Sequence, residues 1–199
     1  MSEKQKNPDA PSEIDSGLVR AFQAGDISAF DRIVLRHKTG IFNLCYWVLA
    51  DYQEANDMAQ VTFMKAYQSL HGFRFESAFS TWLHRIAVNN CKNRMKSWDY
   101  RAKKRTLPLD NPGHADAKGL SAEMEDSAPS PMAALEQKER RNLIRKALHS
   151  LGQEQREIIT LRDIQGLSYE EIAEVTGLNP GTVKSRLGRA RLELKERLR

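Results

Sequence analysis

Hydrophobic positions recur at intervals of three and four residues along most of this chain, which is the spacing of amphipathic helices. The first run extends from Phe30 to Val48, a second from Ala59 to Leu70, and a third from Phe79 to Ala87. A fourth run extends from Leu135 to Leu151, and shorter periodic runs follow it. Because the alternating patterns typical of strands are almost absent, the sequence predicts an all-α fold.

A change of composition divides these helical patterns into two groups. Residues 106–131 contain four prolines, few apolar residues, and five acidic residues against the single Lys118. This composition is typical of a flexible, extended linker. We therefore expect a disordered, polar tail over residues 1–17, a helical domain over 18–105, the acidic linker, and a second helical domain over 132–199.

The C-terminal part of the chain has the local signals of two helices that meet at a tight turn. Ser168 and Glu171 form a capping box at the start of the first helix, and Gly177 supplies the left-handed residue that ends it. Asn179 is a suitable N-cap for the second helix, where Pro180 fits the first turn. This arrangement is a helix-turn-helix, whose second helix can enter the major groove of DNA.

The distribution of charge supports DNA binding by this second helix, although the net charge of the whole chain is only +5. Residues 182–199 contain seven basic and two acidic residues, a bias that suits phosphate neutralisation. A helical hairpin with a solvated basic face is the alternative. The candidate contacts are Thr182, Lys184, Ser185, Arg186, Arg189 and Arg191. Ser185, Arg186 and Arg189 are candidates for base edges, and the Lys184 and Arg191 cations for phosphates.

A second candidate surface for nucleic acid begins in the stretch GFRFESAFSTWLHRIAVNN, which starts at Gly72, and continues to Lys96. Aromatic side chains and a cation occupy a predicted loop, and amides occupy the helix that follows. Such groups suit unpaired bases, at about 1–3 kcal/mol for each stacked base. For each aromatic side chain taken singly, packing in the core is the alternative. The candidates are Phe73, Arg74, Phe75, Trp82, Arg85, Asn89, Lys92, Asn93 and Lys96.

The helix predicted around Phe63 carries a further face that fits neither a core nor plain solvent exposure. This face mixes apolar and polar side chains, which suits contact with a protein partner. Its members are Asp57, Gln60, Val61, Met64 and Gln68.

Three segments of the chain together resemble the signatures of bacterial RNA polymerase sigma factors. They are DMAQVTFMKAY, FRFESAFSTWLHRIAVNNCKN and GLSYEEIAEVTGLNPGTVKSRLGRAR. The sequence is most similar to the small extracytoplasmic-function (ECF) group, sigma-E-like members included, from about Leu18 to Leu198. Many regulators share a helix-turn-helix, whereas this combination of motifs in this order is highly specific.

The resemblance implies a division of labour between the two domains. The first domain, similar to sigma region 2, would bind the clamp helices of core polymerase through residues 57–70 and open the minus-ten element. Its melting loop falls on residues 71–80 and its minus-ten helix on residues 82–96. The second domain, similar to region 4, would read the minus-thirty-five element as duplex and contact the polymerase flap.

Within region 2, the resemblance also implies individual contacts. A flipped base would be held near Phe73, Arg74, Phe75 and Ser77, and Asn89 and Asn93 would contact the minus-ten element. The family further implies control by a separate anti-sigma protein and a stress or envelope-response regulon. The acidic linker either mimics nucleic acid in the polymerase channel, where the family places it, or only increases solubility.

Other features limit the class of protein. No apolar run approaches the roughly 18 residues of a transmembrane helix, and the N-terminus lacks a signal-peptide core, so the sequence predicts a cytoplasmic protein without membrane insertion. Cys45 and Cys91 make no metal-binding or redox spacing, and Cys45 falls within an apolar stripe. Because nucleophile motifs, phosphate-binding loops and metal clusters are not found, we expect no enzyme, metal or cofactor. A stand-alone helix-turn-helix regulator with a sensory domain is the alternative function.

Overall fold

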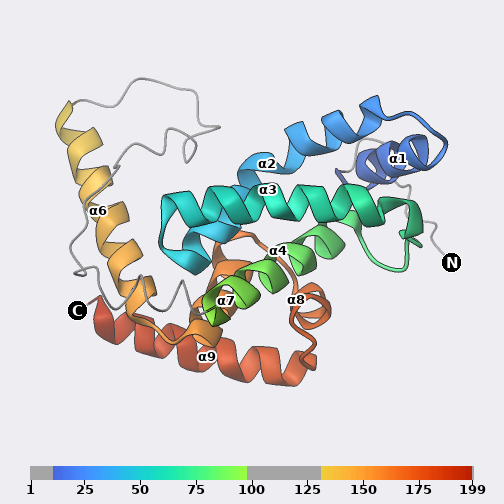
Figure 1. The fold of residues 1–199 in the computed structure, drawn as a ribbon. Helices are drawn as coiled ribbons and strands as arrows, with labels where there is room; N and C mark the ends of the chain where they lie inside the picture. Colours follow the sequence, from blue (N-terminus) through green and yellow to red (C-terminus); the bar gives the residue numbers. More distant parts are fainter. Residues whose placement is uncertain (1–10, 98–130, 199) are drawn as a thin grey trace, which may run out of the picture.

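The computed structural model describes residues 11–97 and 131–198, and every regular element within these ranges is helical (Figure 1). The N-terminal domain contains α1 (Pro11–Gln23), α2 (Ser28–Leu49), α3 (Tyr52–Ser69), the short 3₁₀ helix η1 (Leu70–Gly72) and α4 (Phe79–Lys96). The C-terminal domain contains α6 (Pro131–Ser150), α7 (Gln153–Ile159), the π-helical turn η2 (Thr160–Ile164), α8 (Tyr169–Thr176) and α9 (Pro180–Arg197). The predicted all-α fold is confirmed.

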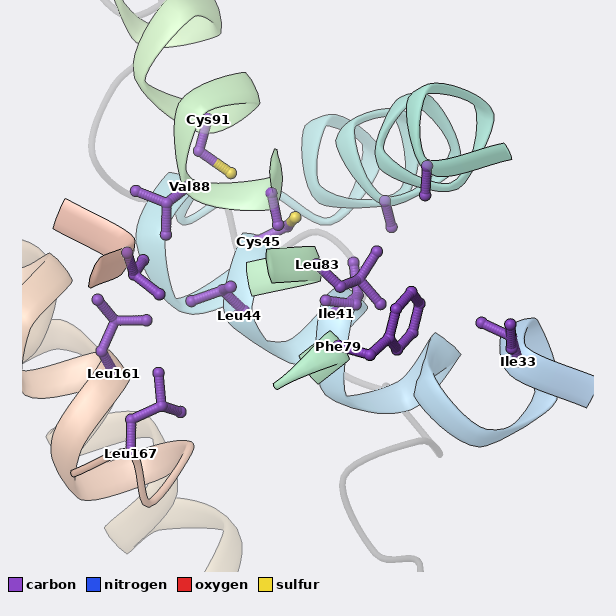
Figure 2. Packing of buried hydrophobic residues seen from close by; sticks show 14 of the residues in the cluster. Ile33, Ile41, Leu44, Cys45, Phe79, Leu83, Val88, Cys91, Leu161 and Leu167 are labelled. Carbon is purple, nitrogen blue, oxygen red and sulfur yellow. The ribbon is translucent and has the colours of Figure 1, made fainter. Parts of the chain in front are cut away.

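Helix α2 forms the centre of the N-terminal domain because it packs against α1, α3 and α4. Its apolar stripe is buried, as the spacing predicted, and includes Phe30, Ile33, Ile41, Leu44, Cys45 and Val48. In Figure 2, Leu83 of α4 lies beside Ile41, and Cys91 of α4 lies above Cys45. Both cysteines are free thiols and are fully buried, so the assignment of Cys45 to the core is confirmed.

The expected N-terminal tail is wrong over residues 11–17, because α1 begins at Pro11. Asp15 of α1 is only 3% exposed and accepts a hydrogen bond of 3.0 Å from Nε of Arg36. Nε2 of His37 lies 3.0 Å from the other carboxylate oxygen. These polar contacts, together with the buried Val19 and Phe22, attach α1 to α2. The predicted linker lies outside the described residues up to Ser130, as do residues 98–105.

The predicted helix-turn-helix signals are confirmed one by one. The Ser168 hydroxyl accepts from the Glu171 amide at 3.1 Å, and the Glu171 carboxylate accepts from the Ser168 amide at 2.7 Å. Gly177 ends α8 with φ of 74°, in the left-handed region that favours glycine. Oδ1 of Asn179 accepts from the Thr182 amide at 2.7 Å and caps α9.

Some positions of the predicted apolar stripes do not reach a core. Leu143 and Ile144 of α6 are 57% and 37% exposed, and Leu198 after α9 is 41% exposed. Together with Glu139 and Arg140 they line an open groove. The stripe of α9 is buried only at Val183, Leu187 and Ala190, which face the rest of the C-terminal domain.

The two domains pack against each other and share a buried hydrophobic cluster, which the sequence did not predict. Leu161 and Leu167 of the C-terminal domain belong to the same buried cluster as Leu44 of α2 and Val88 of α4. Figure 2 shows Leu161 and Leu167 on the side of the cluster where Leu44 and Val88 lie. Helix α4 also contacts α8 directly. The arrangement is therefore a closed one, in which region 131–198 covers one side of α2 and α4 (Figure 1).

Candidate nucleic-acid interfaces

The aromatic side chains after η1 form a packed cluster rather than an open stacking platform. Phe73 is 8% exposed, and its ring centroid lies 5.0 Å from that of Phe75, 5.2 Å from Trp82 and 5.9 Å from Phe79. Phe73 is thus a core residue, and in this arrangement its ring faces protein. Trp82 is half-buried against the same cluster. The core alternative therefore applies to Phe73 and Phe79, and in part to Trp82.

Phe75 differs from the other aromatic residues because its backbone is left-handed, with φ of 59°. A non-glycine residue in this region costs roughly 1–2 kcal/mol, and such strain is concentrated at functional sites. Its half-buried ring carries the guanidinium of Arg20 at 5.1 Å from the centroid. Arg74 is exposed and Ser77 is half-buried, so the loop presents a cation and a hydroxyl beside this strained aromatic residue.

The two consecutive asparagines of α4 have opposite environments. Asn90 is 4% exposed, accepts from Nζ of Lys65 at 2.5 Å and donates to the Thr62 hydroxyl at 3.0 Å. It therefore connects α4 to α3 and is structural. Asn89 is exposed and shares one face of α4 with three further candidates, Arg85, Asn93 and Lys96, which are also exposed.

Lys92 lies at the border of this exposed face and is already paired. Its ammonium contacts Oε1 of Glu157 in α7 at 2.9 Å, across the two domains. The Lys92 side chain is 29% exposed and that of Glu157 is 4% exposed. Burial raises the pKa of the Glu157 carboxyl above its ordinary value, while the bond to Lys92 opposes this shift.

A buried ion pair anchors the C-terminal end of α4 to the start of α3. Nε and one terminal nitrogen of Arg94 donate to the two carboxylate oxygens of Glu54 at 2.5 and 2.9 Å. Glu54 is 4% exposed. This role of Glu54 could not be predicted from the sequence, because an acidic residue near a helix N-terminus is ordinarily solvated.

Helix α9 presents its predicted DNA contacts in two groups. Lys184, Ser185 and Arg189 are exposed, and the face they occupy lies opposite the buried stripe. Arg186 instead donates to Glu154 of α7 at 2.5 Å, and Arg191 makes a bidentate contact with Asp163 of η2. Thr182 is half-buried and its amide is used by the N-cap. The sequence did not reveal these acidic partners, which come from distant segments.

The predicted protein-contact face of α3 is exposed as a unit. Met64 is 62% exposed, Asp57, Gln60 and Gln68 are exposed, and Val61 is half-buried. An unbranched apolar side chain with this exposure on an ordered helix is suited to a protein partner.

Within residues 11–97 and 131–198, no group of three or more His, Cys, Asp or Glu side chains could hold a metal ion. In the same part of the chain, no helix combines the length and apolar character needed to cross a membrane.

Comparison with known proteins assigns both domains to one family. Residues 33–100 match the family model for Sigma-70 region 2, and residues 141–194 match the model for Sigma-70, region 4. The RNA polymerase sigma-H factor of Pseudomonas aeruginosa is 37% identical over 179 residues, which cover 90% of this chain and 91% of that protein. The ECF RNA polymerase sigma-E factor of Haemophilus influenzae is 36% identical over 180 residues, covering 89% of this chain and 91% of that protein.

A solved structure has the same fold. The sigma factor RpoE of Bartonella quintana, in complex with the anti-sigma factor NepR, matches with a TM-score of 0.62 and 28% identity over 86% of this chain and 98% of that chain. The helix-turn-helix and the region 2 bundle define a two-domain transcription factor. This chain belongs to the sigma-70 family of RNA polymerase sigma factors, in its ECF group. It directs core RNA polymerase to promoters and initiates transcription there.

Proposed function

We propose that the exposed face of α4 and the loop before it hold the unpaired minus-ten strand, while α9 reads the minus-thirty-five duplex. The observation that carries this proposal is the exposed row Arg85, Asn89, Asn93 and Lys96 in the domain that matches region 2. Amides offer both donors and acceptors to base edges, and the two cations attract phosphates. The left-handed Phe75, with the exposed Arg74 and the half-buried Ser77, supports a pocket for one flipped base beside this row.

Opening a promoter requires several binding sites that act together. Unstacking and unpairing cost a few kcal/mol for each extruded base, which one small domain does not supply alone. A second DNA anchor on α9 and a polymerase contact on α3 raise the effective concentration of the minus-ten face at its target. The polymerase contact on α3 would be made through Asp57, Gln60, Val61, Met64 and Gln68.

Regulation by a separate protein follows from the relatives. The Bartonella quintana relative forms a complex with an anti-sigma factor. By analogy, this chain is held inactive in the cytoplasm by a cognate anti-sigma protein and directs a stress or envelope-response regulon when released. The chain itself performs no catalysis, and its activity consists of binding and positioning.

The test is promoter opening by purified components. Core polymerase is mixed with the protein and a promoter selected from genomic fragments, and unpaired bases are detected with a permanganate-type probe. Opening that depends on both proteins supports the proposal. Tight, specific binding to promoter duplex without polymerase, combined with no initiation, would instead support the stand-alone regulator.

A further inference from the structure

One row of side chains on α4 is covered by the C-terminal domain. The Thr81 hydroxyl donates to Glu171 at 3.4 Å, His84 lies near Gln165, and Lys92 pairs with Glu157. These α4 residues follow the helical repeat, and their partners run in the opposite order along the C-terminal domain. Val88, which is 1% exposed, completes the row with apolar contacts.

Further polar contacts join the domains on the side of α2. Arg156 of α7, 7% exposed, donates to the Val48 carbonyl at 2.9 Å, and Gln165 donates to the Gly40 carbonyl at 3.3 Å. Buried apolar groups such as Leu161 and Ile172 lie between these contacts. The closed arrangement is therefore stabilised mainly by apolar burial, and these polar contacts add to it.

Lys92 is the residue at which the closed arrangement and the proposed DNA face overlap. It follows Asn89 by three residues and precedes Lys96 by four, so it borders the exposed row. Its ammonium is nevertheless the counter-charge of a carboxylate that is only 4% exposed. A phosphate that takes Lys92 would leave Glu157 buried and unpaired beside a second negative charge, which is strongly unfavourable.

We propose that the Lys92–Glu157 pair is a charge-exchange switch that couples DNA binding on α4 to separation of the two domains. In the closed protein, Glu157 neutralises Lys92. When a DNA phosphate binds Lys92, Glu157 loses its counter-charge and gains water only if α7 moves away from α4. The proposal rests on the proposed function in one respect, namely that DNA reaches the Lys92 side of α4.

The neighbourhood of Glu157 connects the switch to the second DNA-binding helix. Glu154 of α7 raises the pKa of the Glu157 carboxyl, and Arg186 of α9 lowers it. Arg186 and Glu154 also pair with each other at 2.5 Å. Helix α7 thus binds one candidate DNA-binding cation from each domain: Glu157 pairs with Lys92, and Glu154, one turn away, pairs with Arg186. When DNA binds Lys92 and separates it from Glu157, the charge network that also holds Arg186 is disturbed.

The test uses the full chain with dyes attached to Asp31→Cys and Lys195→Cys, because both positions are exposed on opposite domains. The native thiols of Cys45 and Cys91 are fully buried and do not compete for the dyes. Interdomain energy transfer is measured without polymerase for Lys92→Met, Glu157→Gln and the double variant. Lys96→Met is the matched control, since it removes a cation from the same helix one turn further on.

The variants are expected to differ in the ratio of open to closed protein. Lys92→Met leaves Glu157 buried and unpaired, so the ratio of open to closed protein rises at least about tenfold. Glu157→Gln removes the buried charge itself and stays closed, and the double variant returns to the closed state. In this measurement, which contains no DNA, Lys96→Met should give the same energy transfer as the parent protein. If Lys92→Met remains as closed as Lys96→Met, or if the double variant is as open as Lys92→Met, the switch is excluded.

A second arm decides the matter even if Lys92→Met fails to fold. A mixed-sequence single-stranded oligonucleotide of about 20 nucleotides, long enough for several phosphate contacts, is added to the labelled parent protein and to Glu157→Gln. The parent should open on addition, and Glu157→Gln should remain closed. Equal opening of both proteins would overturn the proposal. Because neither arm contains polymerase, failure here is distinguishable from failure of the promoter-opening assay.

Discussion

Asn89 and Asn90 are neighbours in the sequence, but the helical geometry of α4 places their side chains in opposite environments. Asn90 is 4% exposed and bonded to Lys65 and Thr62 of α3, whereas Asn89 is exposed in the row that also contains Asn93. Of these two consecutive amides, Asn90 therefore stabilises the fold and Asn89 is available for binding. The difference allows the two roles to be separated by substitution at adjacent positions.

Replacing both Asn89 and Asn93 by alanine should impair promoter opening while holoenzyme assembly is unchanged. The amides contact DNA in the proposed function, and α3, the proposed polymerase contact, is untouched. Opening is followed with an unpaired-base probe and assembly by co-elution with core polymerase. Gln53→Ala, an exposed amide at the start of α3, is the control. Normal opening by the double variant would remove both amides from the mechanism.

Asn90→Ala should instead destabilise the N-terminal domain, by about 1–3 kcal/mol, because the buried Thr62 hydroxyl loses the donor from which it accepts a hydrogen bond. Lys65 and Thr62 lose the amide that connects them across α3 and α4. Urea unfolding followed by circular dichroism gives the change in the free energy of unfolding. Asn89→Ala, measured in parallel, should change it by less than about 0.5 kcal/mol, as surface substitutions usually do. Equal effects at the two positions would contradict the assignment.

Arg94→Ala should cost about 3 kcal/mol of stability, because it removes the bidentate partner of a buried carboxylate. The guanidinium of Arg94 holds both oxygens of Glu54, which is 4% exposed. Arg94→Lys keeps the charge but not the fork geometry and should give an intermediate loss. Both are measured by urea unfolding. A loss as small as that of Arg85→Ala, an exposed arginine of the same helix, would show that the pair contributes little.

Arg189→Ala should relax discrimination at the minus-thirty-five element by about 1–3 kcal/mol at one base position, if the guanidinium reads a base edge. Lys184→Ala should weaken binding to all sequences alike and lower the salt dependence by about one phosphate contact. Both side chains are exposed on α9. Binding of holoenzyme to a set of single-base promoter variants at several salt concentrations separates these effects. A uniform loss for Arg189→Ala would mark it as a phosphate contact.

The Asp15 carboxylate should make the N-terminal domain sensitive to acid. Burial acts to raise the pKa of Asp15, but hydrogen bonds and charges from His37 and Arg36 outweigh it and lower the pKa below the ordinary 3.8. A lowered pKa means that the folded state binds the proton less readily than the unfolded state. The stabilisation is therefore present above pH 3.8 and is lost as the pH falls through the folded-state pKa. The difference in unfolding free energy between the parent and Asp15→Asn should shrink over that range. A difference that is constant with pH would contradict this assignment.

Much of the fold could be predicted from the sequence because its signals are local. The periodic apolar positions gave the helices, and the capping pair Ser168 and Glu171, the left-handed Gly177 and the Asn179 cap gave the boundaries of the helix-turn-helix. Each signal depends on residues within one turn of each other. The start of α1 was missed because its polar sequence resembles a tail, and only the contacts of Asp15 with α2 show it to be folded.

The residues exposed on a helical face of the candidate sites could be predicted, but the burial of the aromatic residues could not. Exposed residues such as Asn89 and Arg189 were found where expected, since a helical face follows from residue spacing. For Phe73, contact with bases and packing in the core were both open, and the structure places it in the core, because an aromatic residue in a loop carries no signal for which side it faces. Trp82 is shared between the core cluster and the surface for the same reason.

By itself, the sequence determined the helices, their caps, the helix-turn-helix and the membership of the sigma-70 family, because these depend on neighbouring residues and on motif order. Only the tertiary structure decided that the two domains share a core and that Lys92 is the counter-charge of Glu157. The physical reason is that Lys92 and Glu157 are far apart in the sequence, so no periodic pattern predicts their contact. Its energy depends on burial, which arises when the helices pack.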